Sequence, residues 1–123
     1  RIGLVIPNNF ESYQLVCPED SFFPCAASDG EFVETNQYDL ANHRFYEGYI
    51  GCKDAKVAIT TSGLATVNAA LTTQLLIDQY RDSKDPIDFI ITYGIAGGMD
   101  DRLNIGDVLV ASKWAIYNLW VWQ

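Results

Sequence analysis

The stretch TTSGLATVNAALTT, residues 60–73, decides the fold class because it joins the end of an apolar strand to a helix. Apolar residues follow Ser62-Gly63 at helical spacing, and the pattern continues to about Tyr80, before charged residues and Pro86 end it. The residues that set this spacing are Leu64, Val67, Leu71 and Leu75. We therefore predict a strand that runs directly into a helix packed on a sheet.

The Ser62-Gly63 dipeptide at this junction has two interpretations. The serine hydroxyl can cap the helix while the glycine permits a tight turn, and the dipeptide alone favours this interpretation. Alternatively, the hydroxyl and the free N–H groups of the helix start can bind a phosphate, a carboxylate or a ribose hydroxyl.

Strands are predicted on both sides of the junction. RIGLVI, residues 1–6, is a short apolar run that ends at a Pro-Asn-Asn turn and is typical of an interior parallel strand. RFYEGYIG, residues 44–51, and KVAITT, residues 56–61, predict a β-hairpin. IDFIITYG, residues 87–94, and IGDVLVASKWAI, residues 105–116, predict two further strands.

The order strand, hairpin, helix, strand, loop, strand indicates an α/β fold with a mixed central β-sheet flanked by helices. Residues 17–42 contain two prolines, a glycine and many polar side chains, so we predict a loop there, with at most a short strand at 31–34. At 123 residues, the chain is predicted to form a single domain, 1–123.

Composition narrows the classes of partner. Sixteen acidic and eight basic residues give a net charge of −8, which argues against nucleic acid because no basic face is available to neutralise phosphates. No stretch approaches the apolar length of a membrane helix, so no membrane partner is predicted. His43 is the only histidine and has no paired ligand, so no metal site is predicted.

Ligands of open α/β sheets bind at the carboxyl ends of strands, and three segments are predicted to lie there. Glu11 follows the first strand, although a single such carboxylate is usually only solvated. Ser62-Gly63 is the second segment, and GIAGG, residues 94–98, is the third. The third segment matches neither GxGxxG nor GxxxxGK[ST], so it is either a close-packed connection or a site of another kind.

Three motifs occur in order along the chain, and they are SGLATVNAALTTQLL, IITYGIAGGM and LNIGDVLVAS. Together they resemble the nucleoside phosphorylase and nucleosidase superfamily, whose pattern reads approximately SGxGxxNAA, xxGxAGG and xxGDxVV. The N-terminal RIGLVIPNNFE and the hairpin FYEGYIGCKDAKVAITTSG also fit this pattern. The ending KWAIYNLWVWQ, residues 113–123, looks most like the plant branch that includes bark and vegetative storage proteins.

The resemblance implies an activity and a class of ligand. Enzymes of this superfamily cleave the N-glycosidic bond of nucleosides, with phosphate as the nucleophile in the phosphorylases and water in the nucleosidases. The implied partner is therefore a purine-type nucleoside or nucleobase, with no cofactor and with phosphate as co-substrate only in a phosphorylase.

The resemblance also implies roles for individual residues. Glu11 aligns with the carboxylate that activates water in the nucleosidases, where general-base chemistry requires such a group. The residues implied to contact the substrate or phosphate are Ser62, Gly63, Ala96, Gly97 and Gly98, with Arg44 as the nearest arginine for phosphate. Gly106-Asp107 matches a pair that we interpret as structural, with Asp107 completing a turn.

Three features favour an alternative function, and they are Ala65, the lack of an arginine clearly placed for phosphate, and the ending that resembles plant storage proteins. Ala65 stands where the pattern has its second glycine, which adds a methyl group at the start of the helix. The superfamily's base-protonating aspartate comes from segments beyond the last motif, so this chain is expected to carry only the N-terminal part of the family domain. The alternative is a non-catalytic plant storage or nucleoside-binding protein that retains the fold.

The end of the chain leads to two further expectations. Its aromatic residues predict a homo-oligomer that buries Trp114, Trp120 and Trp122. The expected compartment is vacuolar or secreted if Arg1 follows a removed signal, and cytoplasmic otherwise.

Overall fold

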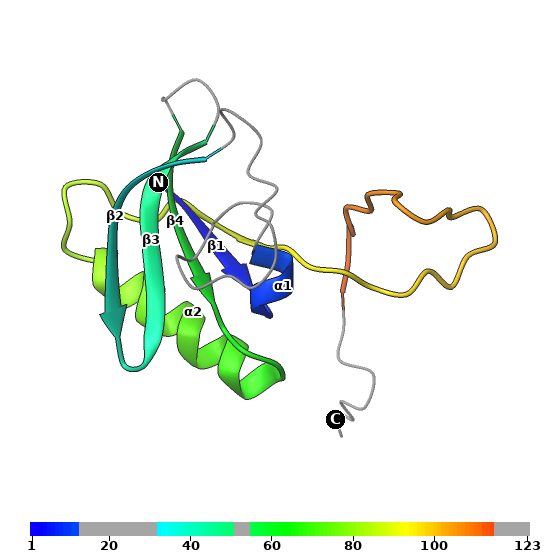
Figure 1. Ribbon diagram of the computed structural model, residues 1–123, viewed down its shortest axis with the longest axis horizontal. Helices are drawn as coiled ribbons and strands as arrows, with labels where there is room; N and C mark the ends of the chain where they lie inside the picture. Colours follow the sequence, from blue (N-terminus) through cyan, green and yellow to red (C-terminus); the bar gives the residue numbers. More distant parts are fainter. Residues whose placement is uncertain (13–31, 51–54, 115–123) are drawn as a thin grey trace, which may run out of the picture.

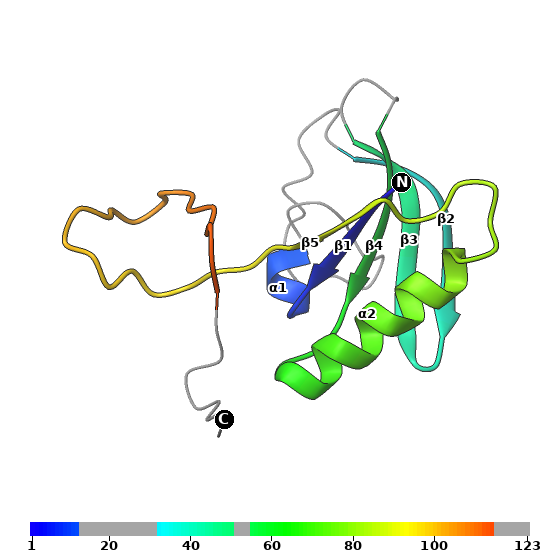
Figure 2. The same ribbon diagram turned by 180° about the vertical axis from the view of Figure 1, so that it is seen from behind.

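The computed structural model describes residues 1–12, 32–50 and 55–114. It contains a five-stranded sheet in the order β2-β3-β4-β1-β5 (Figures 1 and 2). The strands are β1 Ile2–Ile6, β2 Phe32–Leu40, β3 His43–Ile50, β4 Ala55–Thr61 and β5 Phe89–Thr92. Helix α1 spans Asn9–Ser12, and helix α2 spans Thr66–Tyr80. The α/β fold with a mixed sheet is confirmed.

β1 lies between two parallel partners, as the apolar run at residues 1–6 predicted. Leu4 is opposite Ile59 of β4 on one side and Ile91 of β5 on the other. β3 pairs antiparallel with β4 and with β2, so the predicted hairpin is confirmed and the sheet is mixed. The carboxyl ends of β1, β4 and β5 therefore meet at one edge of the sheet, which we call the carboxyl edge.

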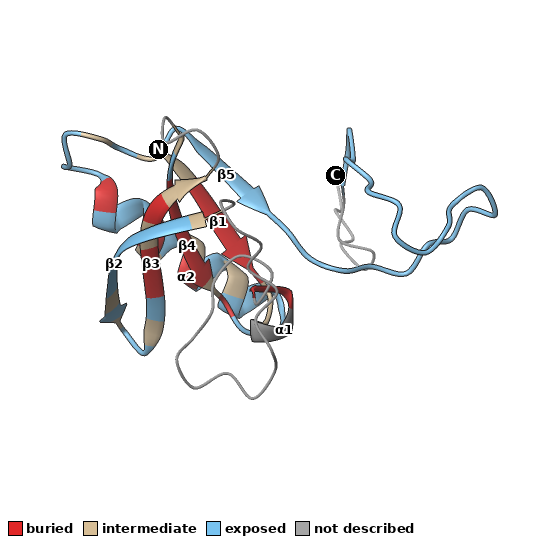
Figure 3. Ribbon diagram, turned by 45° about the horizontal axis from the view of Figure 1, so that its top comes forward, coloured by how far each residue is buried: buried red, intermediate tan, exposed pale blue. Residues whose placement is uncertain are grey.

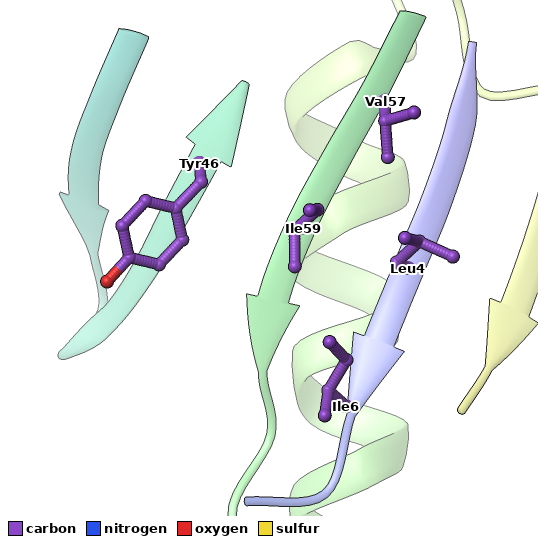
Figure 4. Close-up of a cluster of buried hydrophobic side chains, with 5 residues drawn as sticks. All are labelled: Leu4, Ile6, Tyr46, Val57 and Ile59. Atoms are coloured by element: carbon purple, nitrogen blue, oxygen red, sulfur yellow. The ribbon is translucent and has the colours of Figure 1, made fainter. Parts of the chain in front are cut away.

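The sheet has two apolar faces because successive side chains of each strand point to opposite sides. On one face, β-strand residues such as Val5 and Phe45 pack against Leu76 and Tyr80 of α2. Figure 4 shows the other face, where a second apolar cluster lies on the side of the sheet away from α2. That cluster consists of Leu4, Ile6, Tyr46, Val57 and Ile59.

Helix α2 contacts the sheet through a different stripe from the one that its leucines predicted. The buried side chains of the helix are Thr72, Leu76 and Tyr80, and Leu75 is only partly buried. Val67 and Leu71 are exposed, and so is Leu64 just before the helix. The helix itself is confirmed, whereas the face assigned to the sheet is wrong, because side chains of intermediate polarity at 72 and 80 face the sheet instead.

The short strand expected at 31–34 is in fact the nine-residue β2, which extends to Leu40. Most of its residues are exposed, because β2 is an edge strand that pairs only with β3. A register shift between Glu34 and Asn36 further interrupts its alternation. An exposed edge strand needs few apolar residues, so its sequence lacks the apolar pattern by which strands are predicted. The loop prediction was therefore wrong for residues 35–40.

The strand predicted at 105–116 does not form over the part that the structure describes, which ends at residue 114. Residues 93–114 run away from the sheet after β5, as the yellow and orange trace shows from both sides (Figures 1 and 2). They are exposed throughout, as Figure 3 shows in pale blue. Without a neighbouring strand, the apolar run at 105–110 has no backbone partner for a ladder. Trp114 is exposed, whereas Trp120 and Trp122 lie outside the described residues.

No helix in the described ranges has both the length and the apolar character that a membrane crossing requires.

Candidate functional site

Glu11 is a buried carboxylate at the carboxyl edge of the sheet. Asn8 Oδ1 accepts the Glu11 backbone N–H at 3.1 Å, so Asn8 caps α1 and places Glu11 at the third helical position. A glutamate at this position commonly folds back to the start of its own helix. Here its Oε1 instead accepts the backbone N–H of Ile95 at 2.7 Å.

The two carboxylate oxygens of Glu11 have different environments. The residue is only 7% exposed, and Oε1 is bound to Ile95. Oε2 is buried and has no hydrogen-bond partner among the residues that the structure describes. A buried, unpaired carboxylate oxygen is costly in free energy, so native proteins rarely retain one without a use for it.

Ser62 is buried at the end of β4 and is held against β1. Its backbone N–H donates to the Ile6 carbonyl at 2.8 Å. Its hydroxyl donates to the Gly63 carbonyl at 2.8 Å, with the Ile6 carbonyl oxygen 3.5 Å away. Ser62 does not cap α2, because Ala65 occupies the N-cap position and makes no side-chain hydrogen bond there.

Two residues between β4 and α2 have backbone conformations that favour glycine. Gly63 has φ 76°. Ala65 has φ 78° and ψ 157°, a region that glycine occupies almost exclusively. The glycine that the resembling pattern has at this position would adopt this conformation without strain, whereas the Ala65 methyl group makes it costly.

The glycine-rich segment after β5 divides into two parts. Gly94 lies against Glu11, because a Cβ built at Gly94 would stand 2.9 Å from Glu11 Oε1. Ala96, Gly97 and Gly98 are exposed and lie in the segment that leaves the sheet. The structure therefore brings Gly94 and Ile95 to Glu11, and it places the three predicted ligand-contacting residues farther out.

Arg44 lies at the β2–β3 hairpin and is already paired. Its guanidinium donates to both carboxylate oxygens of Asp39, at 2.9 and 3.1 Å. These hydrogen bonds hold the pKa of Asp39 below its usual value. The two residues line a shallow surface pocket together with Ala41 and Asn42.

Two further predicted residues have local structural roles. His43 Nδ1 lies 3.3 Å from the Thr61 carbonyl and 3.5 Å from Thr72 Oγ1, which ties β3 to the β4–α2 junction. Asp107 Oδ2 accepts the Asn104 backbone N–H at 2.8 Å, so the turn predicted for Asp107 is present. Over the described ranges, no three His, Cys, Asp or Glu side chains are grouped as a metal site would require.

Comparison with known proteins identifies the family. A family model described as the phosphorylase superfamily matches residues 3–119. The chain belongs to the phosphorylase superfamily.

Relatives of this superfamily member include bacterial nucleosidases. The chain is 40% identical over 83 residues to the 5'-methylthioadenosine/S-adenosylhomocysteine nucleosidase of Exiguobacterium sp., covering 68% of this chain and 33% of the relative. It is also 40% identical over 81 residues to the enzyme of the same name from Staphylococcus aureus strain RF122 / ET3-1, covering 66% of this chain and 32% of that one. The chain thus spans about a third of the length of the curated relatives it matches.

Solved structures show the same fold. A nucleosidase of this name from Colwellia psychrerythraea, solved in complex with adenine, superposes with a TM-score of 0.62 at 24% identity. That match covers 86% of this superfamily member and 36% of the other chain. Futalosine hydrolase of Helicobacter pylori gives a TM-score of 0.61 at 18% identity, over 86% of this chain and 37% of that one. At such identities the likeness concerns the fold, and the plant storage branch is not among these relatives.

Proposed function

We propose that the protein hydrolyses the N-glycosidic bond of a purine-type nucleoside, with Glu11 as the general base. The observation that carries this proposal is the buried Glu11 carboxylate, with one oxygen held by Ile95 and the other unpartnered among the described residues. A general base needs a carboxylate whose free oxygen can receive a proton. Glu11 Oε2 meets that requirement at the edge of the sheet where ligands of α/β proteins bind.

The proposed reaction uses the free oxygen of Glu11 directly. Oε2 takes a proton from a water molecule as the water oxygen forms a bond to C1′ of the ribose. The bond between C1′ and the base nitrogen breaks, and the base leaves with the bonding electron pair and takes up a proton from solvent, while Glu11 later returns its own proton to solvent. The charged carboxylate also stabilises the positive charge that develops on the sugar.

Water is supported as the nucleophile by the state of the arginines. Each of the four arginines in the sequence forms an ion pair with a carboxylate of this chain, and their partners are Glu47, Asp39, Asp78 and Asp100. A phosphate site typically uses an arginine with its fork of N–H groups free. The similarity to nucleosidases, one of them solved with adenine, supports water and an adenine-type base.

A non-catalytic binding or storage protein is the second candidate, and Ala65 is the observation that favours it. The alanine holds a strained conformation that a glycine would relieve, next to the buried Ser62. A protein that no longer turns over substrate would tolerate this change at the edge of its site. This candidate predicts binding of adenine or adenosine in calorimetry without release of base.

The test is to incubate the protein with 5'-methylthioadenosine or adenosine, with and without inorganic phosphate, and to quantify free adenine by chromatography. We expect adenine release that does not depend on phosphate, and a loss of about 10²- to 10⁴-fold in Glu11→Gln. Glu34→Gln makes the same chemical change at an exposed strand position and serves as the matched control. A reaction that requires phosphate would contradict hydrolysis, and equal rates for Glu11→Gln and the wild type would contradict the role of Glu11.

A further inference from the structure

Gly94 lacks the usual conformational reason for being a glycine. Its φ lies outside the left-handed region, whereas Gly63 and Gly106 have φ of 76° and 96°. An alanine could therefore adopt the Gly94 backbone conformation without strain. The reason for glycine at this position must be space.

The space at Gly94 is filled by Glu11. A Cβ at Gly94 would stand 2.9 Å from Glu11 Oε1 and 3.3 Å from Glu11 Cδ, with Pro7 Cδ also at 3.3 Å. Cβ atoms essentially never approach other heavy atoms to within 3.0 Å, so the end of the Glu11 side chain, which carries the carboxylate, would have to shift. Gly97 in the same segment has no atom within 4 Å of such a Cβ, so the restriction belongs to Gly94 and is not general to the segment.

The next residue supplies the only hydrogen bond that holds the carboxylate among the described residues. Ile95 N–H donates to Glu11 Oε1 at 2.7 Å, a short bond of the charge-assisted kind. The Ile95 side chain is 89% exposed, so this residue contributes through its backbone and hardly through packing. Both residues therefore contact Glu11 Oε1. Gly94 leaves room for this oxygen, and Ile95 donates a hydrogen bond to it.

We propose that Gly94 and Ile95 position the Glu11 carboxylate. Gly94 leaves room for it, and the Ile95 N–H fixes Oε1, so that Oε2 is the oxygen left to accept a proton. Both are positioning residues, because they act through Glu11. The arrangement leaves the base with a single competent oxygen in a fixed orientation. This inference rests on the proposed function only in assigning a catalytic use to Oε2. The clamp, by which we mean the Ile95 hydrogen bond to Glu11 Oε1 in the space left by Gly94, is testable without substrate.

The first measurement is the Ile95 amide signal in NMR spectra of the ligand-free protein labelled with ¹⁵N and ¹³C. We expect a downfield amide proton and a coupling across the hydrogen bond from Ile95 ¹⁵N to Glu11 ¹³Cδ. Gly94→Ala should lose the coupling and shift the proton upfield, and Glu11→Ala, which removes the acceptor, should do the same, whereas Gly97→Ala should keep both signals. A wild-type protein without the coupling, or Gly94→Ala with the wild-type coupling, would overturn the proposal.

A second pair of variants keeps the test decisive if Gly94→Ala fails to fold. Ile95→Pro removes the N–H donor, and Ile95→Ala removes the exposed side chain but retains the donor. Glu11 ¹³Cδ should change its chemical shift in Ile95→Pro and keep it in Ile95→Ala. The same shift in all three proteins would show that Ile95 does not hold the carboxylate.

The catalytic consequence is tested by a double-mutant cycle on kcat and KM for adenine release. A displacement of the base by about 1 Å can cost on the order of 10²-fold in rate, so Gly94→Ala should lower kcat by about that factor with little change in KM. Gly94→Ala should cost nothing more in the Glu11→Gln background, because both changes remove the same function. Additive losses would indicate that Gly94 does not act through Glu11.

The two proposals fail in different ways. If the NMR coupling is present but no adenine is released, the clamp stands and the proposed hydrolysis does not. If adenine is released but the coupling is absent, the hydrolysis stands and the clamp does not.

Discussion

Two carboxylates, Glu11 of helix α1 and Glu47 of strand β3, differ in how many hydrogen bonds their oxygens accept. Glu47 Oε1 accepts hydrogen bonds from Arg1 Nη1 at 3.0 Å and from the Tyr80 hydroxyl. Glu47 Oε2 accepts one from Asn36 at 3.2 Å. Glu11 is more deeply buried, yet it has one bound oxygen and one without a partner in the described structure.

The environment of Glu47 is that of a structural ion pair. Arg1 also lies 4.3 Å from the centre of the Tyr80 ring, and the Tyr38 and Tyr80 hydroxyls are 3.0 Å apart. Burial alone would raise the pKa of Glu47, but the hydrogen bonds from Tyr80 and Asn36 and the Arg1 charge outweigh it, so that pKa is lowered. Glu47 uses both oxygens to hold the fold together, whereas Glu11 keeps one oxygen without a partner in the described structure, as the proposed role of a general base requires.

The largest expected effect is on catalysis and separates the two carboxylates directly. Glu11→Gln should lower the rate of adenine release about 10²- to 10⁴-fold while changing the free energy of unfolding by less than about 1 kcal/mol. Glu47→Gln should leave the rate of the folded enzyme near that of the wild type. Rates from chromatography and unfolding free energies from urea titrations measure both quantities. Equal loss of activity in the two variants would show that Glu11 and Glu47 do not differ in their importance for catalysis.

The next effect is on stability and concerns Glu47. Glu47→Gln weakens charged hydrogen bonds from Arg1 and Tyr80 in a partly exposed site, so the free energy of unfolding should fall by about 1–2 kcal/mol. Glu34→Gln, at an exposed position of β2, should change it by less than about 0.5 kcal/mol. Urea denaturation followed by circular dichroism makes the comparison. A loss no larger than that of Glu34→Gln would show that the ion-paired cluster contributes little.

The third prediction concerns backbone strain at Ala65, near the carboxyl edge, in contrast to the fully hydrogen-bonded carboxylate of Glu47. Ala65→Gly should raise the free energy of unfolding by about 1 kcal/mol, because relief of the strained φ and ψ outweighs the added entropy of glycine in the unfolded chain. Ala70→Gly, at an exposed position within α2, is the control and should lower stability by about 1 kcal/mol. Urea denaturation followed by circular dichroism measures both variants, and a decrease in the free energy of unfolding of both would rule out strain at residue 65.

The smallest expected effect is the pH dependence contributed by Glu47. Its pKa is lower in the folded protein, so it contributes stability that is present above the ordinary carboxyl pKa and is lost as the pH falls through the lowered value. The difference in unfolding free energy between the wild type and Glu47→Gln should therefore shrink from about pH 6 to about pH 3. Urea titrations at several pH values measure it. A constant difference across this range would show that the charge of Glu47 is not what stabilises the cluster.

Much of the fold could be predicted from the sequence because its central strands are continuous apolar runs. β1, the β3–β4 hairpin, α2 and β5 were found from periodicity and turn residues. β2 was missed because an edge strand with mostly exposed side chains has little apolar pattern. Over residues 105–114, the described part of the strand predicted at 105–116, no strand forms, because apolar residues indicate a strand only where another strand is available to pair with them.

Two residues of the candidate site could be proposed from the sequence, whereas the contacts that hold them could not. Glu11 and Ser62 followed from the resemblance, and both are buried near the carboxyl edge. The use of Gly94 and Ile95 to hold Glu11 was missed, because it joins residues that are far apart in the chain. The only signal for it in the sequence was the first glycine of GIAGG, which the sequence alone leaves as a packing glycine.

The position of β1 between β4 and β5 has a consequence for the order in which the protein folds. β2, β3 and β4 follow one another along the chain and pair as neighbours, whereas β1 must pair with β4 and with the distant β5. Pairings between distant segments form slowly because a long loop must close first. We expect pulsed hydrogen exchange during refolding to protect the β3 and β4 amides before those of β1. The chain would then acquire its fold-stabilising hairpins early and bring Glu11 to Ile95 only in its last folding step.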